Sequence, residues 1–146
     1  MTAVTVPNTQ IETRWIDLTN QHRFDELSEV WAENTVLHQG SDVPDVHGFE
    51  ALTSPPALFC AGIPDLHIHV EQVLGARDTV ILRTTTTATH TGDLLGVPAT
   101  GRTVRYVGVG TYRVIDGNIG EERLNDDLFG LTQTINAAAA PGMDRS

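Results

Sequence analysis

The sequence contains no lysine and only one cysteine. Without lysine, a Schiff-base mechanism or a lysine general base is excluded, so any acid or base must be another side chain. Cys60 lies in an apolar run and has no partner for an internal disulfide, so we interpret it as a small buried side chain. No apolar run approaches the roughly 20 residues of a membrane-spanning helix.

Basic residues are fewer than acidic ones, which leaves a formal net charge of −10. Nucleic acid and anionic membranes are therefore disfavoured as partners, because both are bound by clustered basic side chains. The first residues lack the charged-then-apolar pattern of a secretion signal, so a cytoplasmic location is expected. With 146 residues, of which 40% are hydrophobic, the chain can form one domain with a core and a small pocket.

Helices are predicted in the first half and strands in the second. Apolar spacing near 3.6 residues predicts three helices, over residues 9–20, 23–32 and 47–62, with a short strand at 36–39 before the third. Alternating apolar residues predict four strands, over residues 66–74, 80–90, 103–115 and 119–127. A short terminal helix is expected after Gly130. The Asp116-Gly117-Asn118 segment is typical of a hairpin turn between the last two strands. Helices followed by an antiparallel meander indicate an α+β fold.

Five short segments in this half follow one another in a fixed order. They are F-C-A-G-I-P-D-L at 59–66, T-H-T-G at 89–92, P-A-T-G-R at 98–102, V-I-D-G-N-I at 114–119 and D-x-x-G-L at 127–131. In these segments the chain resembles the SnoaL-like polyketide cyclase family, a branch of the nuclear-transport-factor-2-like (NTF2-like) superfamily.

The resemblance implies a cone-shaped fold, with N-terminal helices packed on a curved, mostly antiparallel sheet that encloses a cavity. It covers a single domain over residues 9–136, between an expected flexible arm at 1–8 and a disordered tail at 137–146. It also implies a hydrophobic small-molecule substrate, no cofactor and no metal, and a homodimer formed by the outer face of the sheet.

The resemblance fails at the position of the cyclase acid/base. In the family that aspartate lies six residues before the glycine of D-x-x-G, which places it at Leu124 here, although Asp127 matches the D-x-x-G carboxylate. Because leucine cannot transfer a proton, we expect a diverged cyclase, isomerase or hydroxylase-like enzyme rather than an aldol cyclase.

Other carboxylates on the same strand provide candidates for this role. Side chains alternate along a strand, so Glu122, Leu124 and Asp126 share one face. If that face lines the cavity, burial would raise the pKa of a carboxyl toward the range useful for acid/base catalysis. Glu122, Asp126 and Asp127 are therefore catalytic candidates. The alternative places Asp126 and Asp127 in a solvated turn.

Two histidines are further catalytic candidates. His90 occupies the histidine position of T-H-T-G and could act as an acid or base near neutral pH, or could instead hold the following turn. His38, on the short strand, falls in a region that lines the cavity in the family. A third possibility is a metal site at His67, His69 and Glu71, which share a strand face, but a solvated histidine pair is the favoured interpretation.

Substrate-binding candidates come from the strands and the first helix. Arg83 lies in an otherwise uncharged strand, where its guanidinium could pair with a carboxylate or orient a substrate carbonyl. Gly108 and Gly110 indicate either a bend in the sheet or space for a flat ligand. The remaining candidates are Tyr106, Tyr112, Trp15 and Leu124, although Trp15 is most simply part of the core.

Two other functions remain open from the sequence. A non-catalytic small-molecule-binding protein would need the cavity but none of the carboxylates. An enzyme like limonene epoxide hydrolase would need an R-x-D strand element, and here Arg83 is followed by Thr84 and Thr85.

Overall fold

The computed structural model describes residues 6–51 and 61–139. The expected arm and tail lie partly outside these residues, and Cys60 and the two prolines at 55 and 56 lie wholly outside them. The elements in chain order are α1 (Val6–Asn20), the 3₁₀ helix η1 (Phe24–Glu29), β1 (Trp31–His38), β2 (Val46–His47), β3 (His67–Ala76), β4 (Thr79–Thr89), β5 (Thr103–Ile115), β6 (Asn118–Asp126) and α3 (Leu128–Ala139).

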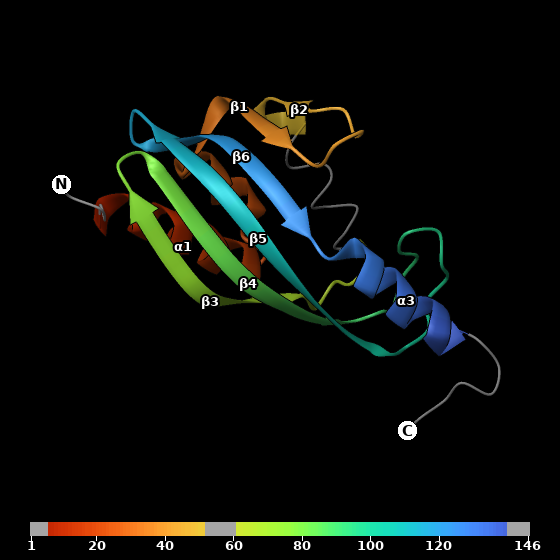
Figure 1. Ribbon diagram of the computed structural model, residues 1–146. Helices are drawn as coiled ribbons and strands as arrows, with labels where there is room; N and C mark the ends of the chain where they lie inside the picture. The colour runs from red at the N-terminus through yellow and green to blue at the C-terminus, as the bar shows by residue number, and fades with distance from the viewer. Residues whose placement is uncertain (1–5, 52–60, 140–146) are drawn as a thin grey trace.

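The strands form one curved, open sheet in the order β2-β1-β6-β5-β4-β3. All neighbouring strands are antiparallel except β1 and β6, which are parallel. Figure 1 shows α1 on one face of the sheet and α3 beyond the end of β6. The predicted α+β class is therefore confirmed.

The β5–β6 hairpin has the predicted turn. Asp116 and Gly117 have φ angles of 52° and 81°, the left-handed pair that a two-residue hairpin turn requires. This turn sets the register in which Tyr112 lies opposite Glu122, and Gly108 lies opposite Asp126.

The helix predicted over residues 23–32 is wrong in its second half. Only a 3₁₀ turn forms at Phe24–Glu29, and Trp31 begins a strand that pairs with Ile119 of β6. Pairing with a strand far along the chain here outweighs the local helical spacing, as tertiary contacts commonly do.

The other predicted helices also differ at their ends. α1 begins at Val6, three residues before the predicted start, and α3 begins at Leu128. The third helix was predicted over 47–62, but His47 ends strand β2. Among the described residues of this range, helical backbone occurs only at 49–51 and 61–62.

Burial alternates strictly along β5 and separates two faces of the sheet. Its even-numbered residues are buried, and its odd-numbered residues from 103 to 109 and at 113 and 115 are exposed. The inner face packs against α1 in one core and against α3 in a second. The sheet is thus covered on one side, as a half-buried antiparallel sheet should be.

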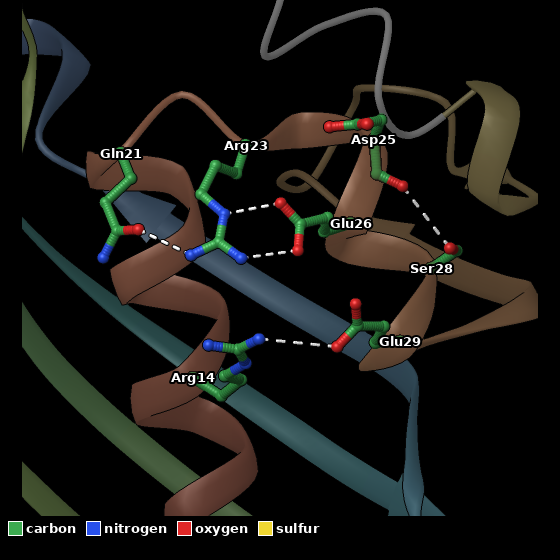
Figure 2. Close-up of polar contacts among 7 residues, drawn as sticks. All are labelled: Arg14, Gln21, Arg23, Asp25, Glu26, Ser28 and Glu29. Carbon is green, nitrogen blue, oxygen red and sulfur yellow. Dashed lines mark hydrogen bonds and ion pairs between the residues drawn. The ribbon is translucent and has the colours of Figure 1, made fainter.

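Polar contacts fix α1 against its neighbours. The Asn20 side chain donates to the backbone O of Ile68 at 2.9 Å and accepts from its N–H at 2.7 Å, which joins the helix end to edge strand β3. Figure 2 shows Arg14 of α1 paired with Glu29 of η1 at 3.4 Å. It also shows Arg23, in the turn before η1, bound to Glu26 by two parallel contacts of 2.5 Å. The Asn20 and Arg14 contacts thus join α1 to β3 and to η1. No helix among the described residues is long and apolar enough to cross a membrane.

Candidate functional site

A cavity of about 620 Å³ lies between α1 and the inner face of the sheet. Its wall is mainly apolar and aromatic and includes the exposed residue Leu128, so the cavity opens to solvent near the start of α3. The candidates that line it are Trp15, Arg83, Tyr106, Tyr112, Glu122, Leu124, Asp126 and Asp127.

Glu122 is a buried carboxyl on the cavity wall. Its side chain is on the inner face of β6, and the residue is only 4% exposed. Burial raises its pKa to about 8, and a hydrogen bond with the Tyr112 hydroxyl offsets part of that rise. Glu122 is therefore mostly protonated at neutral pH and can act as an acid.

Tyr112, which hydrogen-bonds Glu122, also packs against two tryptophan rings. Its ring centroid lies 6.0 Å from that of Trp15 and 6.3 Å from that of Trp31, in tilted or edge-on geometry. Burial raises the pKa of the Tyr112 hydroxyl well above 10, so this hydroxyl remains a proton donor at neutral pH.

Asp126 is a second carboxyl on the same strand face. It is half-buried, and burial raises its pKa to about 6. Its carboxyl lies over Gly108, where an added Cβ would overlap the Asp126 Oδ1. Asp126 is thus mostly ionised at neutral pH while Glu122 is not, so the wall carries a base and an acid of different pKa.

Glu12 of α1 is a buried carboxyl that sequence reasoning missed. The residue is wholly buried, and both carboxyl oxygens lack a hydrogen-bond partner. Burial, followed by the nearby charge of Glu122, raises its pKa to about 9; the approach of the Trp15 indole, without a hydrogen bond of ordinary geometry, offsets part of this rise. Its spacing in the sequence could have revealed this position. Glu12 lies three residues before Trp15 and seven before Thr19, so it shares their helix face, and both of those residues line the cavity.

His38 does not line the cavity, so its predicted pocket role is wrong. The inward residue of β1 is Leu37, and His38 points to the opposite face. There its ring nitrogens lie 2.9 Å from Asp45 Oδ1 and 2.7 Å from Glu121 Oε2. Hydrogen bonds to Glu121 and then Asp45 raise the pKa of His38, so it ties the β1–β2 loop to β6.

His90 is wholly buried in the turn that follows β4. Its Nδ1 lies 2.9 Å from Thr100 Oγ1, and its Nε2 lies 3.2 Å from the backbone O of Val97. Both nitrogens therefore bind one loop, and the residue is not on the cavity wall. The structural alternative for His90 accounts for these contacts.

Arg83, a substrate-binding candidate, is exposed. It pairs in register with exposed Val109 on the outer face, and its Nε lies 3.4 Å from Gln72 Oε1. The residue forms part of the cavity border, but its guanidinium has neither a carboxylate partner in this contact nor a buried position.

His67 and His69 lie next to each other on the exposed face of β3, with ring centroids 4.5 Å apart. A bulge in the β3–β4 register at Glu71 interrupts the alternation that would place this carboxylate beside them. Within residues 6–51 and 61–139, no group of three or more His, Cys, Asp or Glu side chains is arranged to hold a metal ion.

Comparisons with known proteins identify the family and the fold of the chain. The sequence profile of the SnoaL-like polyketide cyclases matches residues 9–135, nearly the whole chain. The chain belongs to this family. No curated protein sequence matches the chain.

Solved structures confirm the fold of this SnoaL-like protein. A candidate SnoaL-like polyketide cyclase from Jannaschia sp. CCS1 has 24% identity and a TM-score of 0.86, with 97% of this chain and 98% of that chain covered. AclR, a candidate hydroxylase from Streptomyces galilaeus, has 22% identity and a TM-score of 0.80, with 88% and 95% covered. IdmH, a candidate polyketide cyclase from Streptomyces antibioticus, has 23% identity and a TM-score of 0.79, with 88% and 98% covered.

The SnoaL-like D-x-x-G segment forms a helix cap in this protein. Asp127 Oδ1 accepts a hydrogen bond from the Gly130 N–H at 2.9 Å, in the first turn of α3. A Cβ on Gly130 would overlap the Asp127 carboxyl, so the glycine leaves room for the cap. Asp127 itself is exposed. We therefore assign it to capping, which matches the strong preference for aspartate at this position.

Removing this cap tests the assignment. Asp127→Ala should lower the free energy of unfolding by about 1 kcal/mol, whereas Asp127→Asn should retain the cap and most of the stability. Urea denaturation measures both values. Because Asp127→Asn removes only the carboxylate, a large loss of turnover in this variant would contradict the capping assignment.

Proposed function

We propose that this SnoaL-like protein is a cofactor-independent acid/base enzyme that acts on a hydrophobic, polyketide-type ketone. The carrying observation is the placement of Asp126 and the Tyr112–Glu122 pair on the wall of a mainly apolar cavity. The reaction is a cyclisation or isomerisation that begins with loss of a proton next to a carbonyl. A hydroxylation could begin with the same enol but would need molecular oxygen as a second substrate. The proposed enzyme differs from the family's aldol cyclases in the position of its carboxylates.

Asp126 and the Tyr112–Glu122 pair have different roles because they differ in ionisation at neutral pH. Asp126, ionised at neutral pH, removes a proton from the carbon next to the substrate carbonyl. The Tyr112 hydroxyl gives its proton to the carbonyl oxygen and takes one from Glu122. The product of this step is a neutral enol, with one proton gained by Asp126 and one lost by Glu122. Return of these protons completes the cycle without an external donor.

The inner wall between these groups fits an apolar substrate. Leu124 lies between Glu122 and Asp126 on β6 and lines the cavity, where the family aspartate would otherwise lie. An apolar side chain there provides contact surface but no chemistry. Placing the proton transfers on either side of Leu124 explains how the site can function without the family aspartate.

Proton exchange tests this function without knowledge of the final product. A panel of aromatic β-diketones incubated with the protein in D₂O should show faster exchange of the protons between the carbonyls, measured by proton NMR. Added EDTA should leave the rate unchanged. Ligand binding to the cavity without exchange or turnover for any compound would contradict the enzyme proposal and favour a non-catalytic binding protein.

The outer face of the sheet supports the expected homodimer. Exposed apolar side chains gather there, among them Leu74, Ile81, Val107 and Val109. Leu74 and Ile81 are direct partners in the β3–β4 register and are 51% and 38% exposed. Burial of such a patch against a second copy is the simplest way to remove it from water.

Placing a charge in this patch should disrupt the dimer. Ile81→Arg is expected to convert a dimer to a monomer, because an arginine would be buried without a partner at the interface. Sedimentation equilibrium measures the mass of each species. Leu95→Arg, at an exposed loop position, is the matched control and should remain dimeric. A monomeric wild-type protein would refute the interface.

A further inference from the structure

Two glycines on the inner face of β5, Gly108 and Gly110, have no role in the proton transfers described above. Neither has a positive φ angle, so the backbone conformation itself does not require glycine. Alanine is normally more stable than glycine within a strand. The feature that distinguishes these positions is what lies over them.

A side chain at either position would displace a group of the site. A Cβ on Gly108 would overlap Asp126 Oδ1 and lie 3.1 Å from Asp126 Cγ. A Cβ on Gly110 would lie 2.5 Å from the Tyr112 hydroxyl oxygen and 2.7 Å from Cζ of its ring. The Asp126 carboxyl and the Tyr112 hydroxyl thus occupy the space that a Cβ would take at these two positions. Both glycines border the cavity, but the space directly over them holds the protein's own side chains.

The positions of Gly108 and Gly110 also set the distance between the proposed base and the proposed acid. Glu122 and Asp126 are four residues apart on β6, a span of about 13 Å between their Cα atoms. Gly108 and Gly110 are only two residues apart, about 7 Å. Because Asp126 lies over one glycine and the Tyr112 hydroxyl over the other, the bound hydroxyl brings the acid function of Glu122 closer to the base.

We propose that Gly108 and Gly110 are positioning residues that hold the Asp126 carboxyl and the Tyr112 hydroxyl at the separation needed for concerted proton transfer. The inference rests on the proposed function for its catalytic meaning. The packing of Asp126 and Tyr112 against the two glycines does not depend on that function, because it follows from the way β5 lies beside β6.

The titratable and charged groups that face or border this region come from four elements. Glu122 and Asp126 project from β6, Tyr112 and Tyr106 from β5, and the buried Glu12 approaches Glu122 from α1. Asp127 lies at the cavity border, at the end of β6. Arg83 of β4 also borders the cavity, but it is exposed and its Nε lies 3.4 Å from Gln72 Oε1. Displacement of Asp126 or Tyr112 is therefore expected to change mainly the ionisation of the carboxyls themselves.

Alanine at each glycine should shift the pH profile in opposite directions. Gly108→Ala moves Asp126 toward the open cavity, so its pKa falls and the acidic limb of kcat against pH moves to lower pH. Gly110→Ala separates Tyr112 from Glu122, so the pKa of Glu122 rises and the alkaline limb moves to higher pH. Each variant should also lose about 10²-fold in kcat, because small misplacements of reacting groups are costly.

Gly120→Ala on β6 is the matched control. The three atoms nearest to its added Cβ all belong to Ile115, with Cδ1 at 2.7 Å, and Ile115 does not line the cavity, so neither limb of the pH profile should move. Opposite shifts in the two test variants support the proposal. Limbs that stay in place, or move in the same direction, overturn it even if stability falls.

Two measurements keep the test independent of folding and of turnover. If Gly108→Ala unfolds the protein, adding Asp126→Ala should restore the unfolding midpoint, because the overlapping carboxyl is removed. If the double variant is no more stable than Gly108→Ala alone, the claim that the Asp126 carboxyl packs against Gly108 is wrong. Carbon-13 NMR titration of the Asp and Glu carboxyls reports the same pKa shifts without substrate. These shifts would stand even if Glu122→Gln and Asp126→Asn kept full activity, a result that would refute only the proposed function.

Discussion

Glu122→Gln is expected to lower kcat by about 10²- to 10⁴-fold, the usual contribution of a general acid or base. Glutamine keeps the size of the side chain and can still bond to Tyr112, but it cannot supply the proton that the hydroxyl passes to the substrate. The alkaline limb near pH 8, set by the pKa of Glu122, should disappear in the residual activity.

Asp126→Asn should cause a loss of similar size but remove the other limb. The base is then absent, so the acidic limb near pH 6, set by the pKa of Asp126, should no longer be seen. Tyr112→Phe should resemble Glu122→Gln, because it interrupts the same path of the proton. Steady-state kinetics across pH 5 to 9 would use the exchange assay or an identified substrate.

The same strand offers matched controls for these substitutions. Glu121→Gln changes the neighbouring residue on the outer face, where its carboxylate binds His38, and Asp127→Asn changes the helix cap. Both should retain kcat within a few-fold. Equal losses in Glu121→Gln and Glu122→Gln would show that the effect comes from β6 in general, and would contradict the assigned acid.

The stability of the protein is expected to fall steadily as pH rises above about 5, because Glu12 and Glu122 are buried without a cationic partner in their contacts. Their pKa values are raised in the folded state, to about 9 and about 8, from an ordinary value of 4.5. Between the ordinary and the raised pKa, the folded protein binds protons that the unfolded chain has released.

The sign follows from this difference in bound protons. Stability is fully present below the ordinary pKa and is lost as pH rises toward the folded pKa, by up to about 1.4 kcal/mol per pH unit for each carboxyl. Glu12→Gln cannot ionise, so it should remove one carboxyl's share of the slope and be more stable than wild type at pH 8.

Urea denaturation between pH 5.5 and 8.5 measures these slopes. Glu33→Gln, on the exposed surface of β1, makes the same chemical change outside the cavity and should leave the wild-type slope unchanged. An identical slope in Glu12→Gln and wild type would show that Glu12 is solvated or paired in the folded protein, which would contradict its buried position.

Local patterns predicted much of the strand-rich half. Residues 103–115 alternate so regularly that the strand and its inner face follow directly, and the Asp116-Gly117 pair defines the turn. The same alternation placed Glu122, Leu124 and Asp126 on one face, and the structure lines the cavity with all three. These features depend on neighbours within a few residues, which is why sequence was enough.

The errors arise where a distant partner decides the structure. Trp31 lies in a locally helical pattern, but pairing with Ile119 makes it a strand residue. His38 was assigned to the pocket, yet the inward position on β1 is Leu37. Arg83 does border the cavity, but it pairs with exposed Val109 and its guanidinium lies near Gln72 rather than in the sheet interior. A shift of one residue reverses the face of a strand side chain, and single-sequence patterns do not fix that choice at uncharged strands.

Glu12 was missed for a different reason. Charged residues are rarely buried without a partner, so a helical stripe is normally read from its apolar members alone. Here the inner stripe of α1 includes a carboxyl beside Trp15 and Ile16. Such an exception is expected near a functional site, where local rules are more often broken.

The most direct test of the acid/base pair is a carbon-13 NMR titration of the Asp and Glu side-chain carboxyls, with Glu122→Gln and Asp126→Asn used to assign the signals. We predict that Asp126 titrates near pH 6 and Glu122 near pH 8, so that one is ionised and the other protonated at pH 7. Titration of both carboxyls near pH 4, the value of solvated side chains, would contradict the proposed division into base and acid.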